Sequence, residues 1–382
     1  MPESNFPFDE CLLKHFVRYK GWLPSCKRRL KAIQSDPKKA RRLRYFTFCA
    51  VGAVDVLMLD VANVIRRSAS DRFDTVVFFD KSEELVLETK KRIPGAIGFT
   101  GDFTDVVLLE DPNEELVVDS ADPLSPPADS QDKRATRQRQ ATLGMRQAYI
   151  QEFPFDIINL DLQDFLFRPK DPMPGKIVNA LRRILEWQKR TRKIDGKGKI
   201  MEVDEFCLMF TTQVGPPVLG EDYREMLISS LDRNIARDTS LGDVLYSRTG
   251  HRDGQSLYNS DFAQFFKVSV PKALLAVLLE EDWYADPKDG LKLFEFDRDF
   301  KGGTYKMLHF VLTVKRQNPK KTNRSPGVVP AEAIDAYAEM AKAVFTNDAI
   351  VVSDETIAPL KAELEKNFTE IKARRKKYYP FA

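Results

Sequence analysis

Thr75-Val-Val-Phe-Phe-Asp80 is the stretch of sequence from which the fold can be derived. Its apolar residues lead directly into an acid, a helical spacing of apolar residues follows over residues 82–93, and a second short apolar run ends at Asp102. Such a run followed by a helical pattern is typical of a buried parallel strand that leads into a crossover helix. Because ligands bind at the carboxyl ends of strands in such sheets, we expect Asp80 and Asp102 to face one crevice.

The same alternation of strands and helices extends in both directions along the chain. Parallel strands are expected over residues 44–50, 75–80, 96–102, 155–161 and 205–212. Helices are expected between them over residues 54–67, 82–93, 133–152 and 176–192. Two further apolar stretches, 291–300 and 304–315, flank a glycine turn and indicate a hairpin. This order predicts an α/β fold with a doubly wound, mostly parallel seven-stranded sheet that ends in an antiparallel hairpin.

The sequence predicts one such domain with additions at both ends and two insertions. A basic helical extension, the domain and a helical C-terminal extension are expected over residues 1–43, 44–316 and 317–382. The insertions are expected over residues 104–132, which are acidic and rich in Pro and Ser, and residues 218–286, which are mainly helical. Pro24 and Pro37 should interrupt the first extension, and Pro271 should kink or split a long apolar helix.

Composition excludes several classes of protein. Hydrophobic residues make up 43% of the 382 positions, which is enough for a sizeable core. The four cysteines and three histidines are scattered, so we expect no metal site and a reducing compartment. No signal peptide is recognised and no apolar run reaches membrane-spanning length, so a cytoplasmic protein without a membrane partner is expected.

Basic residues are concentrated although the net charge is only +3. Twelve Lys or Arg and a single acid lie between Lys14 and Arg44, and the helix expected over residues 133–152 carries four arginines. Three basic segments, 27–44, 182–199 and 372–379, suit contact with phosphates, and tyrosines in the last suit stacking on bases. We therefore expect nucleic acid as a candidate partner, beside a protein partner. A solvated helical surface explains the same charges.

The order of five parallel strands and a terminal hairpin resembles the class I S-adenosylmethionine-dependent methyltransferases. The resemblance covers residues 44–316, and the bacterial three-cysteine-motif partner proteins are similar more weakly. It implies S-adenosylmethionine as the cofactor and methyl transfer to nucleic acid or to a macromolecular amino group.

The resemblance also implies which residues hold the cofactor. Ala50 and Gly52 lie in the family's glycine loop, where the backbone approaches the methionine part of the cofactor closely. Asp80 would accept hydrogen bonds from the ribose hydroxyls. Asp102 would accept from the adenine amino group, with Phe103 against the ring.

Asn159, Asp161 and Phe165 lie where this family places its catalytic loop. Asp161 would accept a hydrogen bond from the target amino group, and Phe165 would stack on a base. A strand-end Asp can instead be a helix N-cap or a turn residue.

Two alternative functions stay open. The family's glycine loop is reduced to Gly52 and the catalytic loop lacks its prolines, which suits a catalytically inactive methyltransferase-like protein that binds nucleic acid or a protein partner. A dinucleotide-dependent oxidoreductase would need Gly-x-Gly-x-x-Gly after the first strand, and that motif is absent.

Overall fold

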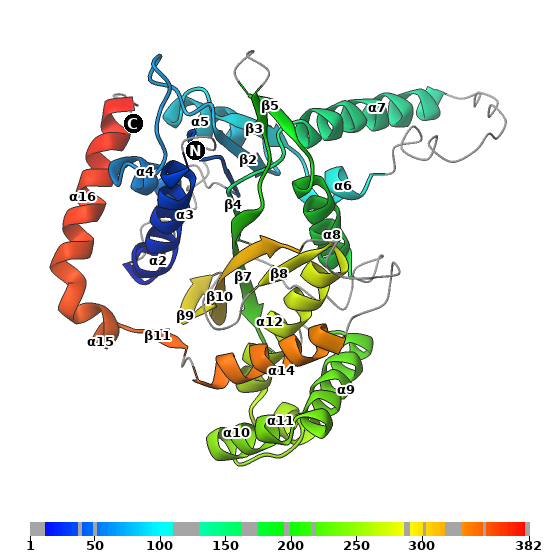
Figure 1. The fold of residues 1–382 in the computed structure, drawn as a ribbon. Helices are drawn as coiled ribbons and strands as arrows, with labels where there is room; N and C mark the ends of the chain where they lie inside the picture. The colour runs from blue at the N-terminus through cyan, green and yellow to red at the C-terminus, as the bar shows by residue number, and fades with distance from the viewer. Residues whose placement is uncertain are drawn as a thin grey trace.

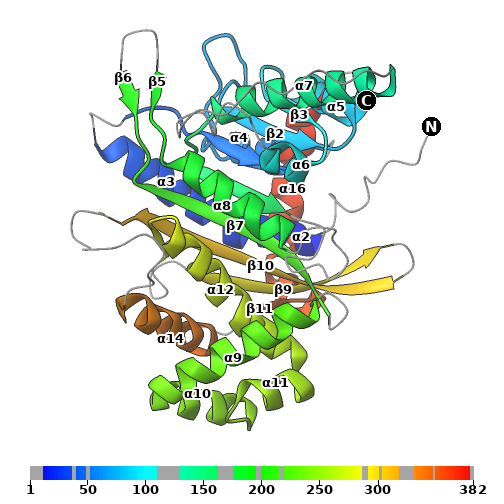
Figure 2. The same cartoon turned by 90° about the vertical axis from the view of Figure 1, so that its right-hand side faces the viewer.

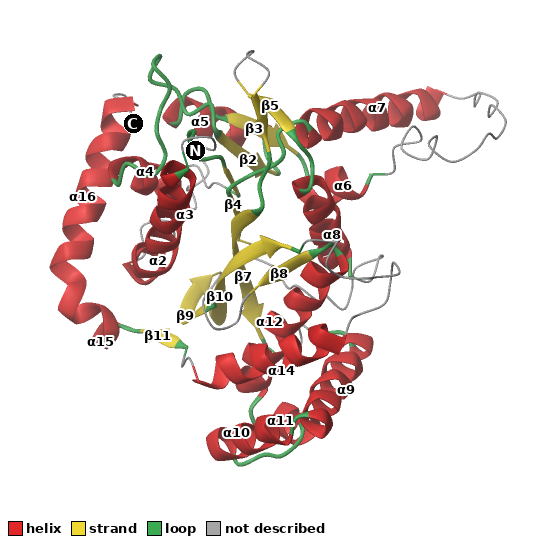
Figure 3. Ribbon diagram, in the orientation of Figure 1, coloured by secondary structure: helices red, strands yellow, loops and turns green. Residues whose placement is uncertain are grey.

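The fold is built on a central sheet with helices on both sides (Figures 1 and 3). The computed structural model describes residues 12–36, 40–48, 52–109, 130–161, 175–194, 199–215, 219–285, 291–300, 303–317, 331–346 and 349–378. Within these residues the chain is an α/β protein with a mixed, mostly parallel sheet of nine strands and with helices near both ends of the chain. The strands are β1 (Tyr45–Thr47), β2 (Val76–Asp80), β3 (Ile97–Thr100), β4 (Ile157–Asp161), β7 (Glu205–Val214), β8 (Trp283–Ala285), β9 (Lys292–Phe300), β10 (Gly303–Arg316) and β11 (Ile350–Val352).

The strand order is β11-β9-β10-β7-β4-β1-β2-β3, and β8 pairs with β10 beside this path. All neighbours from β3 to β7 are parallel, whereas β10 is antiparallel to both β7 and β9. The five parallel strands and the hairpin predicted from the sequence are thereby confirmed. The direction of the order reverses between β1 and β4, so the carboxyl ends of these two strands flank the position at which such sheets bind ligands.

Residues along each central strand alternate between two hydrophobic cores. In β2, Val77 and Phe79 face one core, whereas Val76 and Phe78 face the other. Burial on both faces explains why this strand is a continuous apolar run. The first core includes residues of α6 (Phe103–Leu108), α7 (Ser130–Ile150), α8 (Lys176–Gln188), α12 (Phe262–Glu280) and α14 (Ala331–Thr346). The second includes residues of α2 (Leu12–Val17), α3 (Leu23–Ser35), α4 (Val54–Val61), α5 (Glu83–Arg92) and α16 (Lys361–Tyr378).

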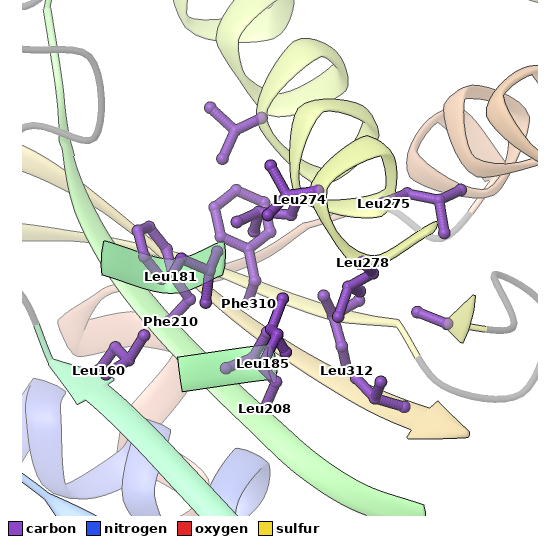
Figure 4. Packing of buried hydrophobic residues seen from close by; sticks show 14 of the residues in the cluster. Leu160, Leu181, Leu185, Leu208, Phe210, Leu274, Leu275, Leu278, Phe310 and Leu312 are labelled. Carbon is purple, nitrogen blue, oxygen red and sulfur yellow. The ribbon is translucent and has the colours of Figure 1, made fainter. Parts of the chain in front are cut away.

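Leucines dominate the first core where α8 and α12 pack on the sheet (Figure 4). Strands β4, β7 and β10 contribute Leu160, Leu208, Phe210, Phe310 and Leu312, and the two helices contribute Leu181, Leu185, Leu274, Leu275 and Leu278. Helix α12 is also the one described helix that is long and apolar enough to cross a membrane, but 67% of its apolar window is buried inside the fold. A core helix of the fold would have the same length and composition.

Residues 219–285, which lie in the range expected as an insertion, are mainly helical. Their helices are α9 (Glu221–Arg237), α10 (Thr239–Thr249), α11 (Gly254–Ser260) and α12. The first three lie beyond α12 and α14, at the end of the molecule away from α4 and α5 (Figures 1 and 2). A kink or a split was expected at Pro271, and the split does not occur, because α12 continues through Pro271 from Phe262 to Glu280.

Pro24 does not interrupt the N-terminal helix either. Helices α2 and α3 are joined through a π-helical stretch, η1 (Arg18–Trp22), into one continuous rod. Pro24 has no N–H to donate to the preceding turn. The helix continues past Pro24 because the preceding turn is π-helical, with the N–H of Leu23 donated to the carbonyl of Arg18. Pro37 lies outside the described residues.

Two strands of the sheet were not predicted. Strand β11 lies in the segment expected as a helical C-terminal extension and pairs in parallel with β9, and α16 then packs against α4. Strand β8 pairs with the far end of β10. Both strands have three residues, which is too short for an alternating pattern to be recognised. A separate ribbon, β5 (Arg192–Ile194) and β6 (Lys199–Met201), follows α8.

Candidate functional site

The turn from β1 into α4 lies beside the reversal of strand order. Gly52 and Ala53 are buried, and Ala53 adopts a left-handed conformation with φ 47°. A left-handed residue allows the chain to leave the strand and enter the helix within a short distance. Ala50 lies outside the described residues, so its contact with the cofactor stays a prediction.

A buried polar network lies behind this turn. Asp55, in the first turn of α4, accepts hydrogen bonds from the Tyr45 hydroxyl and the Thr47 hydroxyl, both at 2.8 Å. Asn159 of β4 donates its side-chain amide to the Tyr45 hydroxyl at 3.0 Å, and its side chain is fully buried. Burial, reinforced by Asp55, raises the pKa of Tyr45 well above its usual range. These contacts give Asn159 a role in joining β1 to β4.

Asp80 ends β2 and is half-buried at the carboxyl edge. One carboxylate oxygen accepts the backbone N–H of Ser82 at 2.9 Å. No side chain of the described residues donates to Asp80 or forms an ion pair with it. Burial raises the pKa of Asp80, and hydrogen bonds from the following backbone N–H groups oppose that rise. The Asp80 carboxylate can therefore accept further hydrogen bonds.

Asp102 lies two residues beyond the end of β3, whose last residue Thr100 pairs with Asp80. It is the N-cap of α6: one oxygen accepts the backbone N–H and the hydroxyl of Thr104, at 3.0 and 2.6 Å. Its other oxygen lies 3.0 Å from the ammonium of Lys81. Burial works to raise the pKa of Asp102, but the hydrogen bonds from Thr104 and Lys81 outweigh it and hold the pKa at about 2. Both oxygens are therefore engaged.

Phe103 lies in the aromatic part of the first core. Its side chain is 9% exposed, and its ring centroid lies 4.9 Å from that of Phe48 and 5.5 Å from that of Phe79. These contacts account for its burial, and stacking against an adenine stays a prediction.

Asp161 lies at the carboxyl end of β4 in a second polar cluster. Its carboxylate is 2.5 Å from the ammonium of Lys14 in α2, and the two side chains are 13% and 6% exposed. Burial works to raise the pKa of Asp161, but the charges of Lys14 and Arg18 outweigh it and lower the pKa. Asp161 is therefore held as a carboxylate under a lysine of the N-terminal rod.

His309 of β10 completes this cluster. The indole N–H of Trp22 donates to its Nε2 at 2.5 Å, so Nδ1 carries the proton and donates to the Thr211 hydroxyl at 2.8 Å. Burial lowers the pKa of His309 to about 3, which keeps the ring neutral. No sequence pattern predicts this cluster, because its members come from segments that are far apart in the chain.

The first basic segment is largely neutralised within the molecule. Asp156, which precedes β4 and is fully buried, forms ion pairs with Arg29 and Arg41 and accepts the backbone N–H of Arg44 at 2.9 Å. The side chain of Arg44 lies 2.7 Å from the carboxylate of Glu152. These pairs lie at the amino ends of the strands, and they support the structural explanation for much of the charge in residues 27–44.

The second basic segment is also paired with acids. Ion pairs join Arg182 to Glu280 at 2.8 Å, Lys189 to Glu281 at 3.1 Å and Arg192 to Glu152 at 2.6 Å. In the third segment Lys372 lies over the ring of Phe368, at 4.8 Å from its centroid. Nucleic-acid binding by these three segments stays a prediction.

The site residues thus fall into separate groups. The pairing of Asp80 with Thr100 places Asp80 and Asp102 near each other at the carboxyl edge, whereas Asn159 and Asp161 belong to different networks on β4. Phe165 lies outside the described residues. In the part of the chain that the structure describes, no group of three or more His, Cys, Asp or Glu side chains could hold a metal ion.

Comparison with models of known protein families gives no match. Comparison with curated proteins gives no match either.

Proposed function

We propose that this chain is an S-adenosylmethionine-dependent methyltransferase of class I that acts on nucleic acid or on a macromolecular amino group. The strand order supports this proposal. From β3 to β7 it follows the order 3-2-1-4-5 of a doubly wound sheet, and the antiparallel β10 and β9 come next. These seven strands carry the resemblance, and β8 and β11 are then additions on the hairpin side.

Asp80 carries the proposal. It is a half-buried carboxylate at the end of the strand beside β1, with no side-chain partner among the described residues. A carboxylate can accept hydrogen bonds from two hydroxyl groups at once, as a ribose would offer. The tight turn at Gly52 and Ala53 supports close approach of a ligand to the backbone at the neighbouring strand end. The residues present therefore fit S-adenosylmethionine.

Asp161 is the residue best placed to orient an acceptor. The cofactor, when bound, supplies an electrophilic methyl group. Lys14 and Arg18 both lower the pKa of Asp161. Arg18 still favours the carboxylate when an amino group takes the place of the lysine ammonium, so Asp161 can accept a hydrogen bond from that group. Catalysis by Asn159 is less well supported, because its amide is committed to Tyr45.

Thermal unfolding with and without millimolar S-adenosylmethionine or S-adenosylhomocysteine tests the proposal. A ligand at 100 times its dissociation constant stabilises the fold by about 2.7 kcal/mol, so the melting temperature should rise by several degrees. Asp80→Asn should abolish the rise. Asp297→Asn, a change of an exposed acid on β9, is the matched control and should keep it. No rise with either ligand in the unaltered chain, or a full rise in Asp80→Asn, would overturn the proposal.

A non-catalytic methyltransferase-like protein is the second candidate. Both residues expected to bind the methyl acceptor already have partners within the protein, and this favours the second candidate. Asn159 is hydrogen-bonded to Tyr45, and Asp161 forms an ion pair with Lys14. This candidate predicts that no S-adenosylhomocysteine forms when the protein is incubated with S-adenosylmethionine and DNA, RNA or basic protein acceptors. Formation of the product above the rate of an Asp80→Asn control would exclude it.

A further inference from the structure

Helix α12 carries two buried polar side chains on the face that is turned away from the sheet. Leu274 and Leu278 of this helix pack on the sheet (Figure 4). At about 100° per residue, Ser269 and Lys272 lie on the other side of the helix and about 60° from each other. They are three residues apart, so their side chains are neighbours. Ser269 is 1% exposed and Lys272 is 4% exposed.

Neither of these polar groups has a hydrogen-bond partner in the part of the chain that the structure describes. The nitrogen Nζ of Lys272 and the hydroxyl oxygen of Ser269 are both buried without a donor or acceptor within reach. A helical Ser can bond back to the carbonyl four residues earlier, and Ser269 does not. Unpaired buried polar groups cost free energy, so a ligand that pairs with both would stabilise the fold.

The charges that act on Lys272 among the described residues come from Arg233 and Asp232 of α9. Asp232 already accepts the backbone N–H of Gly254 at 2.6 Å. Burial lowers the pKa of Lys272 to about 7, the charge of Arg233 contributes to this lowering, and Asp232 opposes it with a smaller effect. The surroundings therefore disfavour a positive charge on Nζ and favour a negative one.

We propose that Lys272 is a modification site that takes up carbon dioxide as a carbamate. The lone pair of the neutral amine forms a bond from Nζ to the carbon, while the electrons of one C=O π bond move onto its oxygen. Nζ then loses one proton to solvent, which leaves an N–H and a carboxylate. This inference goes beyond the proposed function, and it holds whether or not S-adenosylmethionine binds.

The neutral amine that this step needs is available at Lys272. With a pKa of about 7, most of these amines are neutral at pH 7.4. At the same pH only about one in 1,000 is neutral for a lysine with the ordinary pKa of 10.4. Lys272 should therefore react where exposed lysines do not.

The neighbouring groups suit the carbamate. The Ser269 hydroxyl can donate a hydrogen bond to a carbamate oxygen, and the charge of Arg233 attracts the product instead of repelling the ammonium. Carbon dioxide is small and apolar, and small apolar molecules reach buried sites in proteins. An inorganic anion would instead have to give up its hydration shell to enter the core.

Trapping with triethyloxonium on the full chain tests the proposal, because this reagent converts a carbamate into its ethyl ester. After equilibration with ¹³C-bicarbonate at pH 7.4, mass spectrometry should find labelled ethyl carbamate on the peptide that carries Lys272. The peptides that carry the exposed Lys31 and Lys366 should be labelled much less. A carbamate signal in the ¹³C NMR spectrum should be present in the unaltered chain and absent in K272M, which keeps an unbranched side chain and loses no hydrogen bond.

Two further variants test the neighbours of the site. R233Q, a change at an exposed position, and S269A should each lower the carbamate occupancy several-fold at a fixed carbon dioxide pressure. K366Q, which removes an exposed charge from α16, is the matched control and should keep the occupancy.

Carbon dioxide at constant pH should also raise the melting temperature of the unaltered chain and not that of K272M, because the unfolded chain lacks the site. No labelled ethyl carbamate at Lys272, equal labelling of Lys31, Lys272 and Lys366, or equal occupancy in R233Q and K366Q would overturn the proposal. So would an equal rise of the melting temperature with sodium chloride at the same ionic strength, which would indicate a site for a free anion.

Discussion

The two edges of the sheet use their acids in different ways. At the amino edge, Asp156 is fully buried and is bound by Arg29, Arg41 and the backbone of Arg44. At the carboxyl edge, Asp80 ends an equally apolar strand but is half-buried, and among the described residues only the adjacent backbone binds it. An acid beside a buried strand is therefore structural or available according to which basic side chains reach it from distant segments.

Asp156→Ala should have the largest effect on stability. It leaves Arg29 and Arg41 without their shared buried partner, so the free energy of unfolding should fall by about 3–5 kcal/mol. Denaturant unfolding measures this. The control is Asp74→Ala, which removes the exposed partner of Arg42 and should cost no more than about 1 kcal/mol. Equal losses in the two variants would show that the amino-edge acid is not specially structural.

Lys14→Met should have the next largest effect, about 2 kcal/mol, because Arg18 still favours the charge of Asp161. The folded-state pKa of Asp161 is lowered, so its stabilisation is present above the unfolded pKa near 4 and is lost as pH falls through the folded pKa. Without Lys14 this loss on acidification should shrink. Unfolding midpoints between pH 3 and 7 test it, and the exposed Lys31→Met on the same rod should keep the acid limb of the unaltered chain.

Asp102→Ala should cost about 1 kcal/mol through loss of the N-cap of α6, and Asp102→Asn should cost less because Asn also caps helices. With its pKa at about 2, Asp102 stabilises the fold fully above about pH 4 and loses this as pH falls toward 2. Acid titration of the folded fraction should therefore show a smaller loss in Asp102→Asn. An unchanged acid limb would mean that the cap and the Lys81 contact do not act in solution.

Asp80→Asn should have the smallest effect on stability, within about 0.5 kcal/mol. The pKa of Asp80 is raised, so its protonated form is favoured by the fold, and this contribution is present at low pH and lost as pH rises through the folded pKa. Asp80→Asn should remove this small contribution to stability, whose dependence on pH is opposite to that of Asp102. A loss comparable to that of Asp102→Ala would place Asp80 among the structural acids and would end the contrast between the edges.

The strands could be predicted because their cause is local. β2 is buried on both faces, and this demands a continuous apolar run that is visible in the sequence. β8 and β11 could not be predicted, since three residues at the end of other elements are defined by the strands that they pair with. The continuity of the N-terminal rod depends on a π-helical turn, which no residue pattern predicts.

The positions of the site acids could be predicted, but their availability could not. The capping of α6 by Asp102 is local, because Thr104 follows two residues later. The pairing of Asp161 with Lys14 and of Asn159 with Tyr45 depends on the packing of distant segments. The basic residues 27–44 indicated a surface for a polyanion, but several of them form ion pairs with acids just before β4. Those acids are distant in sequence, so the pairs could not be predicted.

The rod formed by α2, η1 and α3 touches both ends of β4, with Lys14 at Asp161 and Arg29 at Asp156. About 22 Å of helix thus lies along about 17 Å of strand and is tied to it at each end. Inserting or deleting one residue between the two ties would rotate one of them by about 100° and leave only the other in place. A one-residue insertion or deletion in this segment should therefore destabilise the fold more than a substitution of an exposed residue within it, and denaturant unfolding would measure the difference.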